Sequence, residues 1–193
     1  MPSRNLSDLY WKLEVVVRKA LEIAKEKDLK VLIICTYRSN QEQKALYSQG
    51  REDLDIVNSI RLQCGLAKLT EKENKKVITW TLKSYHSTEP KSMAFDFCIF
   101  YKNHIIWNIK ADVNDNEIDD YKEFAEICKS LDNNIEWGGD WKKKDWGHIQ
   151  WKDGRNIDQN KVKNIDIEQK TKRNLFELVM NIIRIVLRSL GGH

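Results

Sequence analysis

The sequence is poor in residues that break a chain: it has two prolines and eight glycines among 193 residues. Its four cysteines lack the Cys-x-x-Cys spacing of zinc knuckles and redox motifs. Near the N-terminus, Glu14, Arg18 and Lys19 interrupt the apolar stretch that a signal peptide requires. We therefore expect a folded protein with free thiols, made in the cytosol without a signal peptide.

The charge is also weak for a nucleic-acid-binding protein. The net charge is +4, and charged residues make up 32% of the chain against 41% hydrophobic residues. The basic residues are dispersed, which argues against nucleic acid as a partner and favours solvated surface lysines. A mild positive charge would still help the protein approach an anionic bacterial wall or membrane.

The pattern of apolar residues predicts an α+β fold, because helices and antiparallel strands segregate along the chain. Helices are expected over residues 6–27, 40–49, 56–63 and 119–131, and strands over 30–36, 94–101, 104–109 and 148–151. Ser7 and Asp8 are expected to cap the first helix, and Gly50 to end the second. Residues 1–155 should therefore form one domain, a small antiparallel sheet with flanking helices around a single metal site.

Residues 156–193 are expected to form a linker and a basic amphipathic C-terminal helix over 175–190. The helix is too short and too charged to span a bilayer. Its wide apolar face must pack on the domain, on another subunit or on an anionic membrane surface. The basic residues that favour the membrane are Lys170, Lys172, Arg173, Arg184 and Arg188.

His86, Asp96 and His148 carry nitrogen and oxygen donors of the kind that zinc accepts. Three protein ligands leave one zinc position open, which is typical of catalytic rather than structural sites. An ionised carboxylate in the apolar Ala-Phe-Asp-Phe run is costly unless it is paired or bound to a metal. Ordinary core or surface histidines and a satisfied buried aspartate are the alternative interpretation.

Asp145 and Arg38 are the candidate catalytic residues. Asp145 precedes His148 closely, so its carboxylate is a candidate general base; its alternative role is that of a solvated turn residue. Arg38 follows the strand predicted at 30–36, where its guanidinium would hold a substrate carboxylate or a developing oxyanion. A surface arginine is the alternative.

These residues belong to a series of motifs that resembles one known family. The series is Thr36-Tyr37-Arg38-Ser39, Gln43, Leu46-Tyr47, Gln49-Gly50, Ser84-x-His86, Ala94-x-Asp96, Trp137-Gly138-Gly139-Asp140-Trp141 and Asp145-x-x-His148. It resembles the zinc D-alanyl-D-alanine carboxypeptidase and L-alanyl-D-glutamate endopeptidase family of wall-cleaving enzymes, which includes phage endolysins and bacterial autolysins. The resemblance covers the chain from about residue 6 to residue 151.

The resemblance implies a zinc metallopeptidase that acts on bacterial peptidoglycan. His86, Asp96 and His148 match the zinc ligands, Asp145 the catalytic base, and Arg38 with Gln43 the substrate cleft. The Trp-Gly-Gly-Asp-Trp motif at residues 137–141 resembles the endopeptidase branch of the family more than the carboxypeptidases. The expected activity is therefore cleavage of the L-alanyl-D-glutamate bond of the stem peptide by a phage or prophage lysis enzyme.

Two other activities stay open: a carboxypeptidase that removes terminal D-alanine, and a non-catalytic wall-binding module. The segment between His86 and Asp96 is longer than the family pattern, and residues 88–91 resemble an insertion expected at one lip of the cleft. Asp112, Asn114 and Asn116 loosely resemble a calcium loop. Because Glu117 occupies the position where that loop needs glycine, a polar loop before the 119–131 helix is the better interpretation.

Overall fold

The computed structural model describes residues 2–158 and, in the C-terminal segment, residues 162, 164, 167–168, 171–172, 174–175, 178–180 and 182–184. The chain divides into two compact units, Met1–Asn156 and Ile157–His193. The first unit carries all the residues that the motif series singled out.

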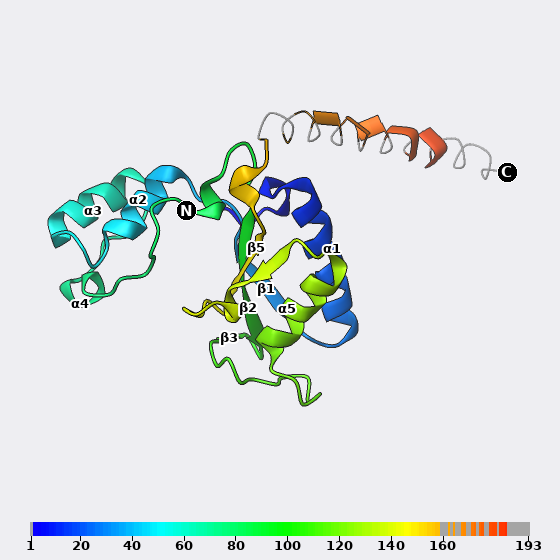
Figure 1. The fold of residues 1–193 in the computed structure, drawn as a ribbon, viewed down its shortest axis with the longest axis horizontal. Helices are drawn as coiled ribbons and strands as arrows, with labels where there is room; N and C mark the ends of the chain where they lie inside the picture. The colour runs from blue at the N-terminus through cyan, green and yellow to red at the C-terminus, as the bar shows by residue number, and fades with distance from the viewer. Residues whose placement is uncertain are drawn as a thin grey trace. The chain divides into compact units, whose positions relative to one another are not determined.

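A five-stranded antiparallel sheet forms the centre of the first unit, as described over residues 2–156 (Figure 1). Its strands are β1 (Val31–Cys35), β2 (Ala94–Tyr101), β3 (His104–Ile106), β4 (Ile135–Trp137) and β5 (His148–Trp151). One edge of β2 pairs with β1. On the other edge, the first half of β2 pairs with β5 and the second half of β2 pairs with β3. Strand β4 pairs with the far edge of β5. Strand β2, the longest of the five, is therefore the central strand with which β1, β3 and β5 pair.

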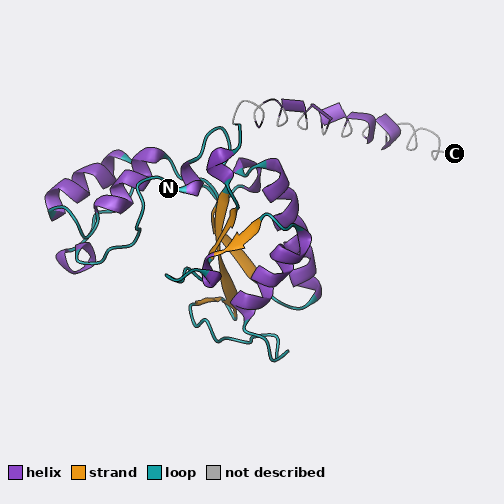
Figure 2. Ribbon diagram, viewed as in Figure 1, coloured by secondary structure: helices purple, strands orange, loops and turns teal. Residues whose placement is uncertain are grey.

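The helices fall into two groups on opposite sides of this sheet (Figure 2). Helices α1 (Trp11–Glu26) and α5 (Asp120–Leu131) cover one face. Helices α2 (Asn40–Ser48), α3 (Leu54–Gln63) and α4 (Glu71–Asn74) form a separate group on the other side. Short 3-10 turns occur at η1 (Leu6–Asp8), η2 (Tyr85–Ser87), η3 (Gly138–Asp140) and η4 (Gly154–Asn156).

The alternation of side chains along β2 separates the core from the face that bears the candidate site. Phe95, Phe97 and Ile99 are fully buried. The Phe97 ring lies 4.8 Å from the Phe124 ring of α5, so this face of the strand forms the core. Burying each such side chain stabilises the fold by about 1.5–3 kcal/mol. Because successive residues of a strand point to opposite faces, Asp96 lies on the other side of the sheet.

The predicted α+β class and the small antiparallel sheet are confirmed, with differences at the ends of elements. The predicted strand at 104–109 ends at Ile106. The predicted helix at 6–27 is divided, because Leu9 bridges to Ser92 and the Tyr10 amide donates to the Ser92 carbonyl at 2.8 Å. Capping by Ser7 and Asp8 was wrong: Tyr10 precedes α1 and makes no side-chain cap. Strand β4 and helix α4 were not predicted.

In the C-terminal unit, the described residues from 162 to 184 are helical. Leu175, Leu178 and Ile182 are exposed there. No helix among the described residues is both long and apolar enough to cross a membrane. Much of the helix expected over 175–190 lies outside the described residues, as do Lys170, Arg173 and Arg188.

The loop before α5 is held by its own polar side chains. The Asp112 carboxylate accepts the backbone N–H groups of Asn116 and Glu117. Asp120, the first residue of α5, is fully buried and accepts the Val113 N–H at 3.1 Å. Burial, opposed by this hydrogen bond and reinforced by neighbouring acidic groups, raises the pKa of Asp120 to about 6. The structure therefore agrees with the prediction of a polar loop here. The carboxylates of Asp112 and Asp120 already accept hydrogen bonds from backbone N–H groups.

We expect Asp120→Asn to stabilise the protein at neutral pH. The folded pKa of about 6 lies above the unfolded value of about 3.9. Protonation therefore favours the fold, and stability falls as pH rises from about 4 through 6, by roughly 1–3 kcal/mol. Asparagine keeps an acceptor for Val113 and carries no charge, so the variant should lose this pH dependence in urea unfolding.

The matched control is Asp115→Asn, an exposed residue of the same loop, which should leave the unfolding curve unchanged. If Asp120→Asn were less stable than the parent at neutral pH, the carboxylate would be a net stabilising group and the inferred direction of its pKa shift would be wrong.

Candidate metal centre and cleft

The register of the sheet places three polar side chains in one row. Asp96 of β2 pairs with Cys35 of β1 on one side and with His148 of β5 on the other. Directly paired residues share a face, so all three lie on the side of the sheet opposite α1 and α5. An irregularity in β1 is part of this arrangement. Ile33 pairs with Phe97, and the register then shifts so that Cys35 lies opposite Asp96.

His86 reaches this row from η2, not from the sheet. The Ser84 hydroxyl caps the turn by accepting the His86 backbone N–H at 3.2 Å. The Arg38 backbone N–H donates to the His86 carbonyl at 3.1 Å, which ties the turn to the end of β1. These contacts fix the ring above the row and leave it 3% exposed.

Three donor atoms converge at this point. His86 Nε2 lies 3.1 Å from Asp96 Oδ1 and 3.3 Å from His148 Nδ1, and the same Asp96 oxygen lies 2.9 Å from His148 Nδ1. Zinc bonds of about 2.0–2.1 Å in tetrahedral geometry place ligand atoms roughly 3.3 Å apart. The observed separations are close to that value.

The second nitrogen of each histidine has a partner of its own. His86 Nδ1 lies 3.2 Å from the Thr36 carbonyl oxygen, and His148 Nε2 lies 3.1 Å from Gln150 Oε1. Metal-bound histidines commonly donate their remaining N–H to such an oxygen, which fixes the ring and its tautomer. The residues therefore fit a zinc ion held by His86 Nε2, Asp96 and His148 Nδ1.

Cys35 is a neighbour that the sequence reasoning did not include. Its sulfur, a His86 nitrogen and an Asp96 oxygen all lie within 4.8 Å of one another. Burial and the Asp96 charge raise the pKa of the Cys35 thiol to about 12, against the opposing effect of Arg38. The Cys35 sulfur contacts Nδ1 of His86, at 3.6 Å, whereas His148 Nδ1 lies 3.3 Å from His86 Nε2, the nitrogen that faces Asp96. This geometry favours His148 over Cys35 as the third donor.

The two histidines also determine the ionisation of Asp96. Burial by itself would raise the pKa of Asp96, but the His86 charge and the hydrogen bonds from both rings hold it well below its usual range. For His148, burial lowers the pKa, and Asp96 with Asp145 more than compensates, so the pKa is raised. The carboxylate thus stays charged at neutral pH, as a metal ligand must.

Arg38 and Gln43 form a linked pair beside this centre. Arg38 Nη1 donates to Gln43 Oε1 at 2.9 Å, and Nη2 lies 3.6 Å from Asp96 Oδ2. The Gln43 amide donates to Thr79 and Thr81 and is only 1% exposed. Arg38 lines the cleft, whereas Gln43 lies behind it and connects α2 to the chain segment at 79–81.

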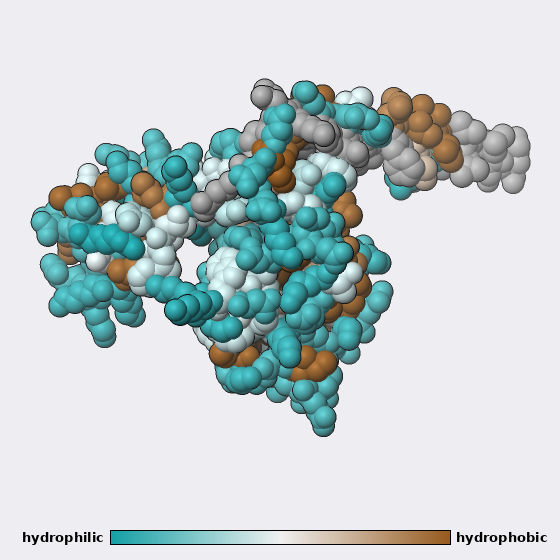
Figure 3. All heavy atoms as spheres, viewed as in Figure 1, coloured by the Kyte–Doolittle hydropathy of each residue, from teal (hydrophilic) through white to brown (hydrophobic). Residues whose placement is uncertain are grey.

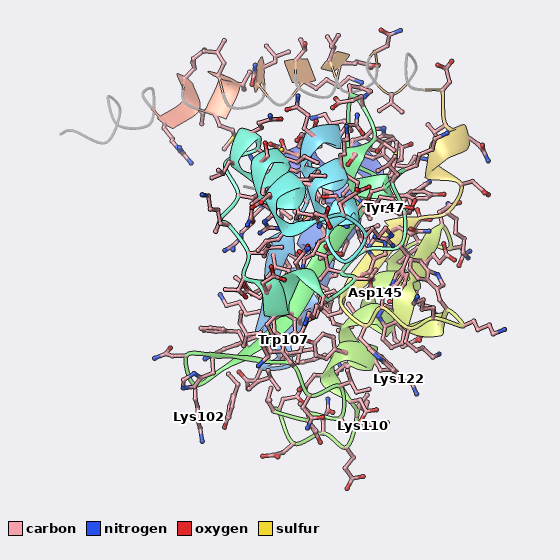
Figure 4. The ribbon with its side chains drawn as sticks, turned by 90° about the vertical axis from the view of Figure 1, so that its left-hand side faces the viewer. Tyr47, Lys102, Trp107, Lys110, Lys122 and Asp145 are labelled. Carbon is pink, nitrogen blue, oxygen red and sulfur yellow. The ribbon has the colours of Figure 1, made fainter. Side chains whose placement is uncertain are left out.

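Asp145 is brought to the same cleft by a tight turn after β4. Its backbone N–H donates to the Gly138 carbonyl at 3.0 Å, and its carbonyl accepts the His148 N–H at 3.2 Å. A Cβ at Gly138 would lie 2.3 Å from the Asp145 carbonyl oxygen, so this approach requires glycine. Desolvation raises the pKa of the Asp145 carboxyl, opposed by His148 and reinforced by Asp96. Asp145 is labelled in Figure 4, higher in that view than Trp107 and Lys102.

The cleft itself has a volume of about 580 Å³, within the range of roughly 300–1,000 Å³ usual for ligand sites. Figure 3, viewed as in Figure 1, shows an opening between the part of the chain that holds α2–α4 and the rest of the first unit. The segment at 78–81 and the 141–145 turn line it, together with the metal-centre residues, and Lys143 lies over the exposed Trp80 ring. Residues 88–91 do not line this cleft; Lys91 donates to the Ser7 carbonyl.

Comparison with known proteins confirms the resemblance inferred from the motifs. The family profile described as D-alanyl-D-alanine carboxypeptidase matches residues 78–151, a span that includes His86, Asp96, Asp145 and His148 but not Arg38. The peptidoglycan L-alanyl-D-glutamate endopeptidase CwlK of Bacillus subtilis (strain 168) is 35% identical over 131 residues, which cover 66% of this chain and 64% of that protein. The chain thus spans less than two thirds of the length of this curated relative.

Two solved structures are similar at lower identity. The L-Ala D-Glu endopeptidase ChiX of Serratia marcescens is 20% identical with a TM-score of 0.47, over 78% of this chain and 88% of that one. The LdcB LD-carboxypeptidase is 14% identical with a TM-score of 0.42, over 81% of this chain and 63% of that one.

Proposed function

We propose that this chain is a zinc-dependent peptidoglycan endopeptidase that cleaves the L-alanyl-D-glutamate bond of the stem peptide. The observation that carries the proposal is the convergence of His86, Asp96 and His148 in a cleft that Asp145 and Arg38 also line. The choice of bond rests on the 35% identical Bacillus subtilis endopeptidase. An origin in a phage or prophage lysis system stays a prediction from the motif resemblance.

In this proposal His86, Asp96 and His148 hold the zinc ion. When bound, zinc acts as a Lewis acid that polarises the scissile carbonyl and makes water a stronger nucleophile. Because these donors come from a paired row of the sheet and from a capped turn, their positions do not depend on substrate binding. Such rigidity is what a catalytic metal site needs.

Asp145 would accept a proton from the attacking water and return it to the leaving amine. Its raised pKa brings the carboxyl closer to the pH at which both transfers are efficient. The carboxyl lines the cleft and makes no side-chain hydrogen bond that would keep it from this role, among the residues described. Its position after the Gly138 turn places it on the side of the cleft nearest His148.

Arg38 would bind the negative charge of the substrate. Its guanidinium is oriented by Gln43, and its Nε has no hydrogen-bond partner within the described structure. A glutamate that follows the scissile bond keeps a free carboxylate, which a guanidinium recognises with directed hydrogen bonds. Lys143 and Lys144 add positive charge along the same cleft.

The second candidate is a D-alanyl-D-alanine carboxypeptidase, because the matching family profile carries that description. Its substrate also presents a carboxylate, so Arg38 suits both. Mass analysis of fragments from purified cell walls separates the possibilities. We expect fragments with a new D-glutamate amino end and no release when a chelator is present. Release of free D-alanine would establish the carboxypeptidase, and wall binding without any release would establish a non-catalytic module.

We expect the purified protein to bind one zinc ion and His148→Ala to lose it, because two donors cannot hold the ion against a chelator. Metal analysis after dialysis measures the content. His104→Ala is the matched control, since His104 is exposed on β3, away from the three donors. Stoichiometric zinc and full activity in His148→Ala would show that the ligand set is wrong.

Asp145→Asn should retain zinc and fold normally, yet cleave cell walls more slowly by about 10²–10⁴-fold, since the amide cannot accept the proton. Initial rates on isolated cell walls measure the loss. Asp140→Asn removes an exposed carboxylate from the preceding turn and should keep the parent rate. A loss below about tenfold for Asp145→Asn would place the general base elsewhere.

Contact between the C-terminal helix and an anionic membrane stays a prediction. The described residues of this segment show exposed apolar side chains at Leu175, Leu178 and Val179, which agrees with a face that lacks cover within its own unit. The division into residues 1–155 as peptidase and 156–193 as linker and helix is likewise a proposal.

A further inference from the structure

Two cationic side chains from different parts of the chain lie at the segment that forms one wall of the cleft. Arg51, shortly after α2, donates from Nη2 to the Thr79 carbonyl at 3.0 Å, and its guanidinium lies 3.9 Å from the centre of the Tyr47 ring. Lys143, from the turn that forms the other wall, lies over the ring of Trp80, the residue next to Thr79. The two charges are therefore held at adjacent positions of one segment.

No acidic side chain neutralises this pair of cations within the part of the chain that the structure describes. Neither Arg51 nor Lys143 forms an ion pair there with an aspartate or a glutamate. Loss of hydration and, after it, the charge of Arg51 lower the pKa of the Lys143 ammonium. Two like charges held close together repel each other, so an anion that binds beside both of them is favoured.

The charges of the whole cleft also call for a second anion. Two acidic and three basic side chains line it, namely Asp96, Asp145, Arg38, Lys143 and Lys144. The zinc ion of the proposed function would balance the two acids, and the glutamate carboxylate of the substrate would pair with Arg38. Lys144 is directed to the Gly139 carbonyl, to which it donates at 2.6 Å. Lys143, with Arg51 near it, is left without an anionic partner.

Arg38 and Arg51 are connected to the same stretch of chain. Arg38 donates to Gln43, and the Gln43 amide donates to the Thr79 hydroxyl and the Thr81 carbonyl. Arg51 donates to the Thr79 carbonyl. A substrate that places its glutamate carboxylate at Arg38 therefore has the second pair of cations along the same wall. Alanine, before the proposed scissile bond, has no side-chain carboxylate, so the residue after glutamate is the one that can supply a second anion.

We propose that Lys143 and Arg51 form a specificity subsite for a carboxylate on the substrate residue that follows glutamate. The Trp80 ring supports the ammonium group, and the Thr79 carbonyl orients the guanidinium. The preferred substrate is then a peptide with a free carboxylate on each of two successive residues. The inference rests on the proposed function, because it takes glutamate as the residue that Arg38 binds. The subsite takes no part in bond cleavage and changes only how well the substrate is held.

Two stem peptides that carry either diaminopimelate or lysine after D-glutamate test the subsite. Lysine is diaminopimelate without its second carboxylate, so the comparison isolates one charge. We expect kcat/KM to be about tenfold higher for the diaminopimelate peptide, because each of two partly hydrated charge pairs contributes up to about fivefold. The preference should shrink in about 1 M salt, where the Debye length is about 3 Å.

Lys143→Met keeps the length of the side chain and removes its charge, so it should reduce the preference to about threefold or less. Lys143→Glu should abolish the preference, because the new carboxylate offsets the charge of Arg51. The preference is a ratio of two rates, so a partial loss of folded protein leaves it unchanged. Lys142→Met is the matched control: Lys142 is exposed in the same turn, does not line the cleft, and should keep the parent preference. Equal cleavage of both peptides by the parent, or an unchanged preference in Lys143→Met, would overturn the proposal.

The product peptides γ-D-glutamyl-diaminopimelate and γ-D-glutamyl-lysine separate the subsite from the proposed activity. They lack the scissile bond, so calorimetry measures their affinities even for a protein that cleaves neither stem peptide. Tighter binding of the diaminopimelate product by the parent, reduced in Lys143→Met, would support the subsite even if the proposed activity failed. Equal affinities for the two products would overturn the subsite whether or not the protein cleaves cell walls.

Discussion

The arrangement of β2 between β1 and β5 is the constraint on which the rest of the site depends. Because Asp96 pairs with Cys35 and His148 at the same level, one backbone register brings two donors and a thiol together. A slip of one residue would turn Asp96 into the core and Phe95 or Phe97 out of it. Core packing on Phe124 therefore opposes any slip, and the same contacts that stabilise the fold hold the candidate metal centre in position.

Asp96, which is half-buried, and Asp120, which is fully buried, show how much the surroundings decide ionisation. Asp96 and Asp120 both lose hydration, and burial raises the pKa of each. Asp96 lies against two histidines whose charge and hydrogen bonds outweigh burial. The groups that act on Asp120 are a backbone N–H and other acids, so its pKa stays raised at about 6. Burial of an acid therefore indicates a metal or catalytic site only when the partners are cationic or are themselves donors to a metal.

Sequence reasoning recovered the class of fold and the main helices and strands. Of the site residues that it singled out, His86, Asp96, His148, Asp145 and Arg38 line one cleft, whereas Gln43 does not. The strongly periodic segments, such as α5 and β2, were predictable because their apolar residues repeat at the period of the element. The place of Cys35 was not, since it depends on a shift of register in β1 that leaves no mark in the residue pattern. Strand β4 is too short for periodicity to show. The pairing of β4 with β5, which places Glu136 opposite Gln150, could therefore not be predicted from the sequence.

The cleft also explains why donor residues alone do not select between an endopeptidase and a carboxypeptidase. In the proposed function, His86, Asp96 and His148 would serve either reaction, and either substrate would offer a carboxylate to Arg38. The two reactions differ in how much of the substrate peptide the cleft must accommodate beyond the scissile bond. That distinction is made by the cleft walls, which here come from the segment at 78–81 and from the 141–145 turn rather than from the sheet. Trp80 and Lys143 meet across these two walls, outside the rigid rows of strands, so specificity can change by altering either loop while the metal centre keeps its geometry.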